Sequence, residues 1–162
     1  MGKRKKKKET TPGELLVCSN PKARQRFEIE ERIEVGMVLG GSEVKSLRAR
    51  SADLEGAYAS FEAGELWLHK MHIAPYDQAS VFGHKPKRSR KLLAKAKELR
   101  RLFGKLSTRG YTLVPLRVYF RNGWAKVELG LAFGKKTPDR REDLRKRAEL
   151  REARVGARAA KR

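Results

Sequence analysis

Residues 114–131 read VPLRVYFRNGWAKVELGL and form the clearest structural signal in this chain. Apolar side chains alternate before the Asn122-Gly123 pair and again after it. They are Val114, Leu116, Val118 and Phe120, then Ala125, Val127, Leu129 and Leu131. An Asn-Gly pair suits a type I′ turn, whose twist matches that of paired strands. The stretch therefore predicts a β-hairpin with one apolar face.

Two stretches nearer the N-terminus also have the pattern of strands. Phe27, Ile29, Ile33 and Val35 alternate with glutamates at 28, 30 and 34, and a bulge would explain the disturbed spacing near Glu31. A second hairpin is predicted where residues 57–61 and 66–68 flank Ala63 and Gly64.

Two helices are predicted between these strands. Ser42 is typical of an N-cap, and its helix would cover residues 43–49. A longer helix is predicted from Ser89 to Gly104. Its apolar residues have helical spacing: Leu92, Leu93, Ala96, Leu99, Leu102 and Phe103. Short strands with packed helices predict a mainly β fold with about three helices, a small antiparallel barrel of the oligonucleotide-binding (OB) kind.

The chain has the length of one domain with two basic ends. Residues 13–134 are predicted to form the OB-like domain, and residues 1–12 a disordered basic arm that either contacts RNA or only aids solubility. Residues 135–162 form a basic C-terminal tail with a thin apolar stripe. We expect this tail to be disordered when free and helical when bound, because so little apolar surface cannot stabilise a helix alone.

Charge is the strongest global property of the sequence. The 162 residues include 40 Lys and Arg against 19 Asp and Glu, a formal net charge of +21. Such an excess predicts a polyphosphate partner, foremost RNA. No apolar run approaches the roughly 18 residues of a membrane-spanning helix, and no signal-peptide pattern follows the basic start. We therefore expect a cytoplasmic protein without a membrane partner.

Side chains typical of catalysis or metal binding are few. Cys18 is the single cysteine, which excludes an internal disulfide and a cysteine zinc cluster. His69 and His72 would lie on opposite faces of a strand. The glutamates at 28, 30, 31 and 34 could hold Mg²⁺ in a nuclease, but the polar face of a half-buried strand explains them better. We expect no catalytic residue, no metal and no cofactor.

Five strings carry a family resemblance. They are Asn20-Pro21-Lys22-Ala23-Arg24, Gly40-Gly41-Ser42-Glu43-Val44-Lys45-Ser46-Leu47-Arg48, His72-Ile73-Ala74-Pro75-Tyr76, Arg90-Lys91-Leu92-Leu93, and Gly134-Lys135-Lys136 with Asp139-Arg140-Arg141. In this order and at this spacing they resemble the SmpB family over roughly residues 17 to 155. A ribosomal or ribosome-assembly protein would share the composition, and only these strings speak against it.

The resemblance implies an OB-type barrel that binds the tRNA-like domain of tmRNA (SsrA RNA). Similar proteins deliver this RNA, charged by alanyl-tRNA synthetase and accompanied by elongation factor Tu with GTP, to stalled ribosomes in trans-translation. They transfer no group themselves. The protein would thus act as a binding partner rather than an enzyme.

The family positions that matter for tmRNA binding fall here on Asn20, Glu34 and Leu93. The expected RNA-binding set is Asn20, Lys22, Arg24, Gln25, Phe27, Glu34, Arg90, Lys91 and Leu93. Gln25 and Phe27 replace a histidine and a tyrosine common in relatives. Glu34 would accept hydrogen bonds from bases or 2′-hydroxyls and so supply selectivity. Alternatively, Glu34 only pairs with an arginine of the sheet, and Leu93 belongs to the core.

The resemblance assigns the tail a separate role. It implies that the tail enters the empty messenger channel and decoding centre of the small ribosomal subunit. The expected ribosome-binding residues are Lys135, Lys136, Asp139, Arg140, Arg141, Arg145, Lys146 and Arg147. Pro138 replaces a histidine often found just before the aspartate, which removes a stacking ring at that position.

Overall fold

The computed structural model of the protein describes residues 12–77, 83–134 and 148. Most of the predicted arm and tail, with all eight tail residues named above, therefore lies outside the described residues. The elements, in chain order, are β1 (Glu14–Ser19), α1 (Pro21–Arg26), β2 (Phe27–Met37), α2 (Gly41–Arg48), β3 (Ala52–Asp53), β4 (Tyr58–Glu62), β5 (Glu65–His69), β6 (His72–Ile73), β7 (Arg90–Leu93), α3 (Ala96–Leu106), β8 (Tyr111–Arg121) and β9 (Trp124–Gly134).

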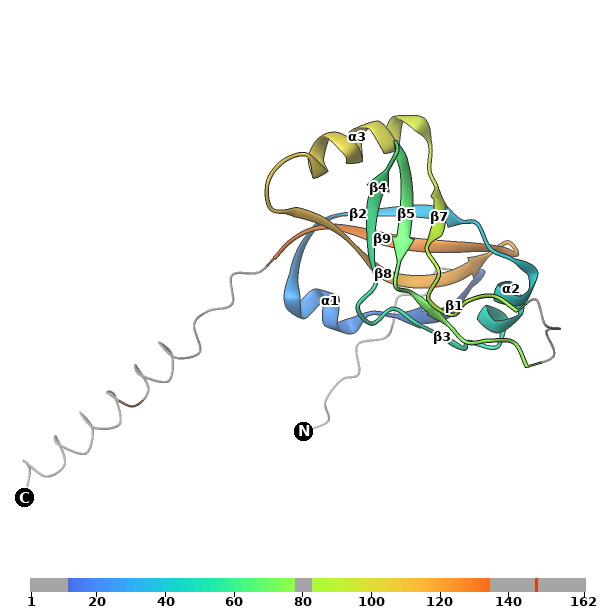
Figure 1. Cartoon of the computed structure of the whole chain (residues 1–162). Helices are drawn as coiled ribbons and strands as arrows, with labels where there is room; N and C mark the ends of the chain where they lie inside the picture. The colour runs from blue at the N-terminus through green and yellow to red at the C-terminus, as the bar shows by residue number, and fades with distance from the viewer. Residues whose placement is uncertain (1–11, 78–82, 135–147, 149–162) are drawn as a thin grey trace, which may run out of the picture.

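The main sheet closes on itself. Its antiparallel strands pair in the order β8-β4-β5-β7-β2-β9, and β9 pairs back onto β8. β1 adds to the far half of β8, and β3 pairs with β6 apart from this ring. In Figure 1, β4, β5 and β7 run across the direction of β2, β8 and β9, and α3 lies over one end of β4 and β5. The predicted mainly β, OB-like fold with three helices is confirmed.

The hairpin of β8 and β9 is confirmed with its turn. Asn122 and Gly123 both have positive φ, 50° and 79°, as a type I′ turn requires. The strands pair from Tyr111 opposite Phe133 to Arg121 opposite Trp124. The predicted hairpin of β4 and β5 is also present, with Ala63 and Gly64 between its strands.

Two bulges divide the apolar residues of the long strands between two faces. The register shifts between Ile29 and Glu31 in β2, and between Pro115 and Arg117 in β8. A bulge inserts one unpaired residue, so the side chains beyond it alternate in the opposite sense. Ile33 and Val35 thus face the barrel core, whereas Ile29 does not. The single apolar face predicted for β2 and for β8 was wrong, whereas it holds for Ala125, Val127, Leu129 and Leu131 of β9 and the bulge near Glu31 was correct.

The apolar residues outside the barrel make a small second core under α1. It consists of Ala23, Val114, Leu116 and Ala132, with Phe27 and Ile29 packed against it. Gly130 belongs to the same place, because a Cβ there would lie 3.1 Å from Ile29 Cδ1. The first core cluster lies inside the ring and includes Leu68, Leu102 and Leu129, all fully buried. α1 is therefore fixed to the outside of the barrel.

The predicted helix from Ser89 to Gly104 was wrong in its first half. Arg90–Leu93 is the strand β7, which pairs with β5 on one side and with β2 on the other. The helix α3 begins only at Ala96, where Glu98 Oε2 accepts a hydrogen bond from Lys95 N (3.1 Å). Helical spacing and strand pairing compete for the same leucines here, and two neighbouring strands favour the strand.

α2 begins earlier than predicted. Its N-cap is Gly40 rather than Ser42, and Glu43 Oε2 accepts from Gly40 N at 2.8 Å. The hydroxyl of Ser42 instead lies 2.9 Å from His84 Nδ1.

Within the described residues, no helix is long and apolar enough to cross a membrane.

Candidate nucleic-acid interface

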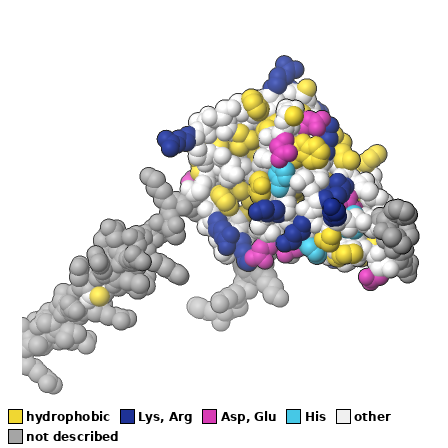
Figure 2. All heavy atoms as spheres, viewed as in Figure 1, with side chains coloured by type: hydrophobic (Ala, Val, Ile, Leu, Met, Phe, Trp, Pro, Cys, Tyr) yellow, Lys and Arg dark blue, Asp and Glu magenta, His cyan; other side chains and the backbone are white. Residues whose placement is uncertain are grey.

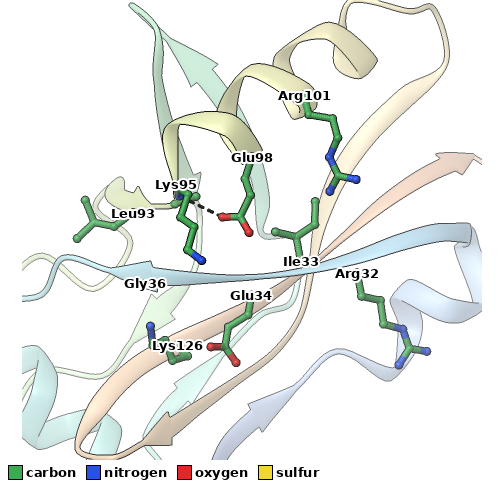
Figure 3. A pocket seen from close by; sticks show the side chains of 10 residues that line it. Arg32, Ile33, Glu34, Gly36, Leu93, Lys95, Glu98, Arg101 and Lys126 are labelled. Atoms are coloured by element: carbon green, nitrogen blue, oxygen red, sulfur yellow. Dashed lines mark hydrogen bonds between the residues drawn. The ribbon is translucent and has the colours of Figure 1, made fainter.

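A groove of about 540 Å³ lies where α3 passes over β2. Its lining comes from β2, from β7 with the segment after it, from α3 and from β9. The lining residues are Arg32, Ile33, Glu34, Gly36, Leu93, Ala94, Lys95, Glu98, Arg101 and Lys126. In Figure 3, Glu98 and Arg101 extend from α3 toward β2, while Glu34 and Lys126 lie on the other side of that strand in this view. The lining has four cations and two carboxylates, and Arg32 and Arg101 also pair with Glu128 and Glu31 beside it. Lys95 and Lys126 are thus the lining cations most available to a polyanion.

Glu34 is held by two donors inside this groove. Tyr119 Oη donates to Glu34 Oε2, and Arg121 Nη1 lies 2.6 Å from the same oxygen. Both partners contact Oε2, and neither contacts the other carboxylate oxygen of Glu34. About a third of the Glu34 side chain remains exposed. The alternative role of Glu34, an ion pair with an arginine of the sheet, therefore exists. The same side chain is also partly exposed to the groove.

Tyr119 is a buried donor. The residue is 1% exposed, and the guanidinium groups of Arg117 and Arg121 lie 4.6 and 5.5 Å from the centroid of its ring. Burial raises the pKa of Tyr119, and the hydrogen bond to Glu34 raises it further. Its hydroxyl thus keeps its proton at neutral pH and donates it to the carboxylate.

The same arginines connect Glu34 to carboxylates of β1 and β9. Arg121 pairs with Glu14, Arg117 Nη1 lies 2.9 Å from Glu14 Oε2, and Arg117 also pairs with Glu128. Burial acts to raise the pKa of Glu14, but hydrogen bonds and charge from Arg121 and Arg117 outweigh it and hold that pKa low. Glu34 therefore belongs to an extended ionic network that restricts its position.

Leu93 lies at the edge of the groove with 53% of its surface exposed. Its neighbour Leu92 is buried in the barrel, so the strand alternation sends Leu93 outward. Gly36 pairs with Leu93, and a Cβ at Gly36 would lie 3.5 Å from Leu93 Cβ. The choice between core and surface for Leu93 is settled in favour of the surface, and the groove floor beside it carries no side chain.

Arg90 lies in the interior rather than on the predicted RNA surface. It is 0% exposed, and its Nε lies 2.8 Å from Glu43 Oε1. Its Nη1 and Nη2 donate to the carbonyl oxygens of Met71, Arg88 and Pro86 at 2.8 to 3.1 Å. Lys91, next in sequence, is half-exposed and pairs with Glu65. Every nitrogen of the buried guanidinium therefore has a partner, and these contacts hold α2 and the segment before β7.

The predicted residues around α1 lie at a second, smaller hollow of about 190 Å³. Asn20, Lys22 and Phe27 line it, together with Tyr58 and others, while Arg24 and Gln25 are on the exposed side of α1. Asn20 has a structural role, because its Oδ1 accepts from Ala23 N (3.2 Å) and its Nδ2 donates to Pro115 O (3.3 Å). Lys22 pairs with Glu55. These residues do not share a groove with Glu34 and Leu93.

The sequence reasoning missed most of the groove. Arg32, Lys95, Arg101 and Lys126 were not proposed, and Lys126 had a usable signal, since alternation in β9 places it on the polar face with Glu128. Figure 2 shows Lys and Arg spread over the viewed face among hydrophobic side chains, so charge alone does not mark the groove.

Comparisons with known proteins agree with one another. The family model described as SmpB protein matches residues 17–159. The SsrA-binding protein of Geobacter metallireducens is 54% identical over 140 residues, which covers 86% of this chain and 92% of that protein. The SsrA-binding protein of Desulforudis audaxviator is 53% identical over 148 residues, 91% of this chain and 95% of that protein.

A solved structure gives the same result. A chain from a structure described as "tmRNA-SmpB: a journey to the center of the bacterial ribosome" superposes with a TM-score of 0.63 and 52% sequence identity. The match covers 78% of this chain and 90% of the other.

Proposed function

This chain belongs to the SmpB family, and from that membership we propose that it binds tmRNA, the SsrA RNA, and acts with it at the ribosome in trans-translation. The SmpB family is one of RNA-binding proteins and not of enzymes. Among the described residues, no group of three or more His, Cys, Asp and Glu side chains is placed to hold a metal ion. The proposed function, RNA recognition and delivery, rests on the family membership.

The geometry of Glu34 is the observation that best supports RNA recognition at the groove. The four lining cations, Arg32, Lys95, Arg101 and Lys126, would bind phosphates of any RNA. A carboxylate among them repels phosphates, so in a complex with RNA Glu34 would accept a hydrogen bond from a base or a 2′-hydroxyl, in addition to its ion pair within the sheet. Tyr119 and Arg121 both contact Oε2, so the other carboxylate oxygen is left available for this hydrogen bond.

The finer assignments extend this proposal. The RNA element is the tRNA-like domain, contacted by Glu34 and Leu93 in the groove and by the exposed residues of α1. Residues 135–162 would occupy the empty messenger channel and decoding centre, as a basic segment that folds on RNA. Alanyl-tRNA synthetase and elongation factor Tu with GTP would be indirect partners that act on the same RNA. We assign the protein to the cytoplasm because its partner is the ribosome.

The test is binding to the tRNA-like domain in competition with excess ordinary tRNA at physiological salt. Nonspecific phosphate binding weakens steeply with salt, so survival against the competitor measures recognition. The full chain and its Glu34→Gln variant are compared, with Glu62→Gln on β4 as a matched exposed control. We expect Glu34→Gln to bind the domain roughly 10-fold more weakly, the value of one charged hydrogen bond, and Glu62→Gln to bind normally.

Equal affinity of the unmodified chain for both RNAs would refute the proposal. It would leave a general basic RNA binder. Selective binding that Glu34→Gln does not change would keep the function and move recognition away from this groove.

A further inference from the structure

The rings near Glu34 differ sharply in exposure. Tyr119 is 1% exposed, with the guanidinium groups of Arg117 and Arg121 near its ring, so its ring is not open to a partner. Trp124, opposite Arg121 in the hairpin, is 73% exposed, the most exposed large hydrophobic side chain in the described part of the chain. None of the ring or cation–π contacts among the described residues involves it. An exposed indole offers a large flat apolar face to a partner, and tryptophan is enriched at interfaces for this reason.

The strand register places Trp124 beside the groove. Side chains two residues apart share a face of a strand, so Trp124, Lys126 and Glu128 point to the same side of β9. Glu34 is the pairing partner of Glu128, and Gly36 is the partner of Lys126. The order along this face is therefore Trp124, then Lys126 beside Gly36, then Glu34. Arg121, the partner of Trp124, reaches Glu34 with its guanidinium.

The side chains on this face of β9 and β2 indicate what kind of ligand it can bind. Lys126 offers a cation to a phosphate, and Gly36 leaves the floor between Leu93 and Lys126 free of a side chain. The surface next to Lys126 is thus open on the side of Gly36. Cations next to an open aromatic face are the combination that binds unpaired nucleotides, whose bases stack and whose phosphates are neutralised.

We propose that Trp124 is the stacking platform for one unpaired base of the bound RNA, next to the nucleotide that contacts Glu34. This inference rests on the proposed function and adds a residue and a contact to it. Stacking tolerates every base, so Trp124 contributes affinity and demands an unpaired nucleotide, whereas Glu34 selects a hydrogen-bond donor. A continuous double helix offers no free base face on which Trp124 could stack.

The chain allows a direct optical test, because it contains only two tryptophans, Trp67 and Trp124. The Trp67→Phe variant of the full chain leaves Trp124 as its single indole. Titration with the tRNA-like domain should quench its emission and shield it from acrylamide, and the change should saturate together with binding measured by the anisotropy of labelled RNA. Unchanged emission and acrylamide access at saturating RNA would overturn the inference.

Affinity gives the second readout. Trp124→Ala should bind the RNA on the order of 10-fold more weakly, as expected for one lost base stack, while Trp124→Phe should retain most of the affinity. Leu15→Ala is the matched control, since Leu15 is also exposed, at 65%, and follows Glu14, which faces Arg121. Thermal midpoints of all variants verify that they fold.

The outcomes separate the two proposals. If the unmodified chain binds the RNA and Trp124→Ala binds equally well, the inference fails and the proposed function stands. If Trp124→Ala keeps RNA affinity but loses association with ribosomes, Trp124 contacts a ribosomal surface and the inference fails as well. Absence of selective binding by the unmodified chain would refute both.

Discussion

Replacement of Arg90 by methionine separates a structural role from an RNA contact. Arg90 belongs to a string that resembles a family motif, yet its guanidinium is 0% exposed. Methionine keeps the length and the apolar stem of the side chain while it removes the charge. We expect a large loss of stability and no loss of RNA affinity in the protein that remains folded.

The magnitude follows from the contacts of the guanidinium. Removal of Arg90 takes away one ion pair to Glu43 and hydrogen bonds to three carbonyl oxygens, those of Met71, Pro86 and Arg88. Glu43 is itself fully buried and would retain only Arg88 and Gly40 N. Loss of one partner of a buried pair costs about 3–5 kcal/mol. For a domain of this size, this corresponds to a fall in Tm on the order of 10 °C or more.

The assay is urea unfolding monitored by circular dichroism, with RNA binding measured at a temperature where the variant is folded. Lys91→Met is the matched control, because Lys91 is the next residue of β7 and its pair with Glu65 is exposed. A surface pair of this kind contributes about 0–1 kcal/mol. If Arg90→Met lowered the free energy of unfolding no more than Lys91→Met, the structural argument would be refuted. If it folded normally and lost RNA affinity, Arg90 would contact RNA after all.

Tyr119→Phe should lower the free energy of unfolding by about 1–2 kcal/mol, and it should weaken tmRNA binding only when Glu34 is present. A double-mutant cycle of Tyr119→Phe with Glu34→Gln, measured by RNA binding, should therefore show coupling, and additive effects would contradict this prediction. The pKa values of Glu14 and Glu43 lie below the ordinary 4.5 in the folded protein, so these carboxylates stabilise the fold above pH 4.5 and lose this effect as the pH falls through the folded pKa values. Urea unfolding at pH 7, 5 and 3 should show that the free energy of unfolding declines below pH 4.5, and equal stability at pH 5 and 3 would contradict this. Deletion of residues 135–162 should leave binding to the tRNA-like domain largely unchanged and abolish trans-translation on stalled ribosomes in a peptide-tagging assay, whereas loss of both activities would contradict separate roles for domain and tail.

Local patterns in the sequence were sufficient for the fold class. Alternation on both sides of Asn122-Gly123 specified a hairpin and its turn, because a two-residue turn with positive φ at both positions strongly favours this pair. The family strings were sufficient for the family, since five short motifs in one order identify a common fold without any knowledge of contacts.

The candidate site was less accessible, because it depends on register and on contacts between distant segments. The bulge between Ile29 and Glu31 reverses the alternation in β2, so Glu34 and Ile29 share a face that simple alternation assigns to different sides. Arg90 looked like a surface cation because the carboxylate that neutralises it, Glu43, is 47 residues away and can be located only in the folded chain. No local pattern in the sequence distinguishes Trp124 from Tyr119, and only packing makes the first an exposed ring and the second a buried donor. Periodicity reports the local backbone, whereas burial and ion pairing are set by which strands become neighbours when the barrel closes.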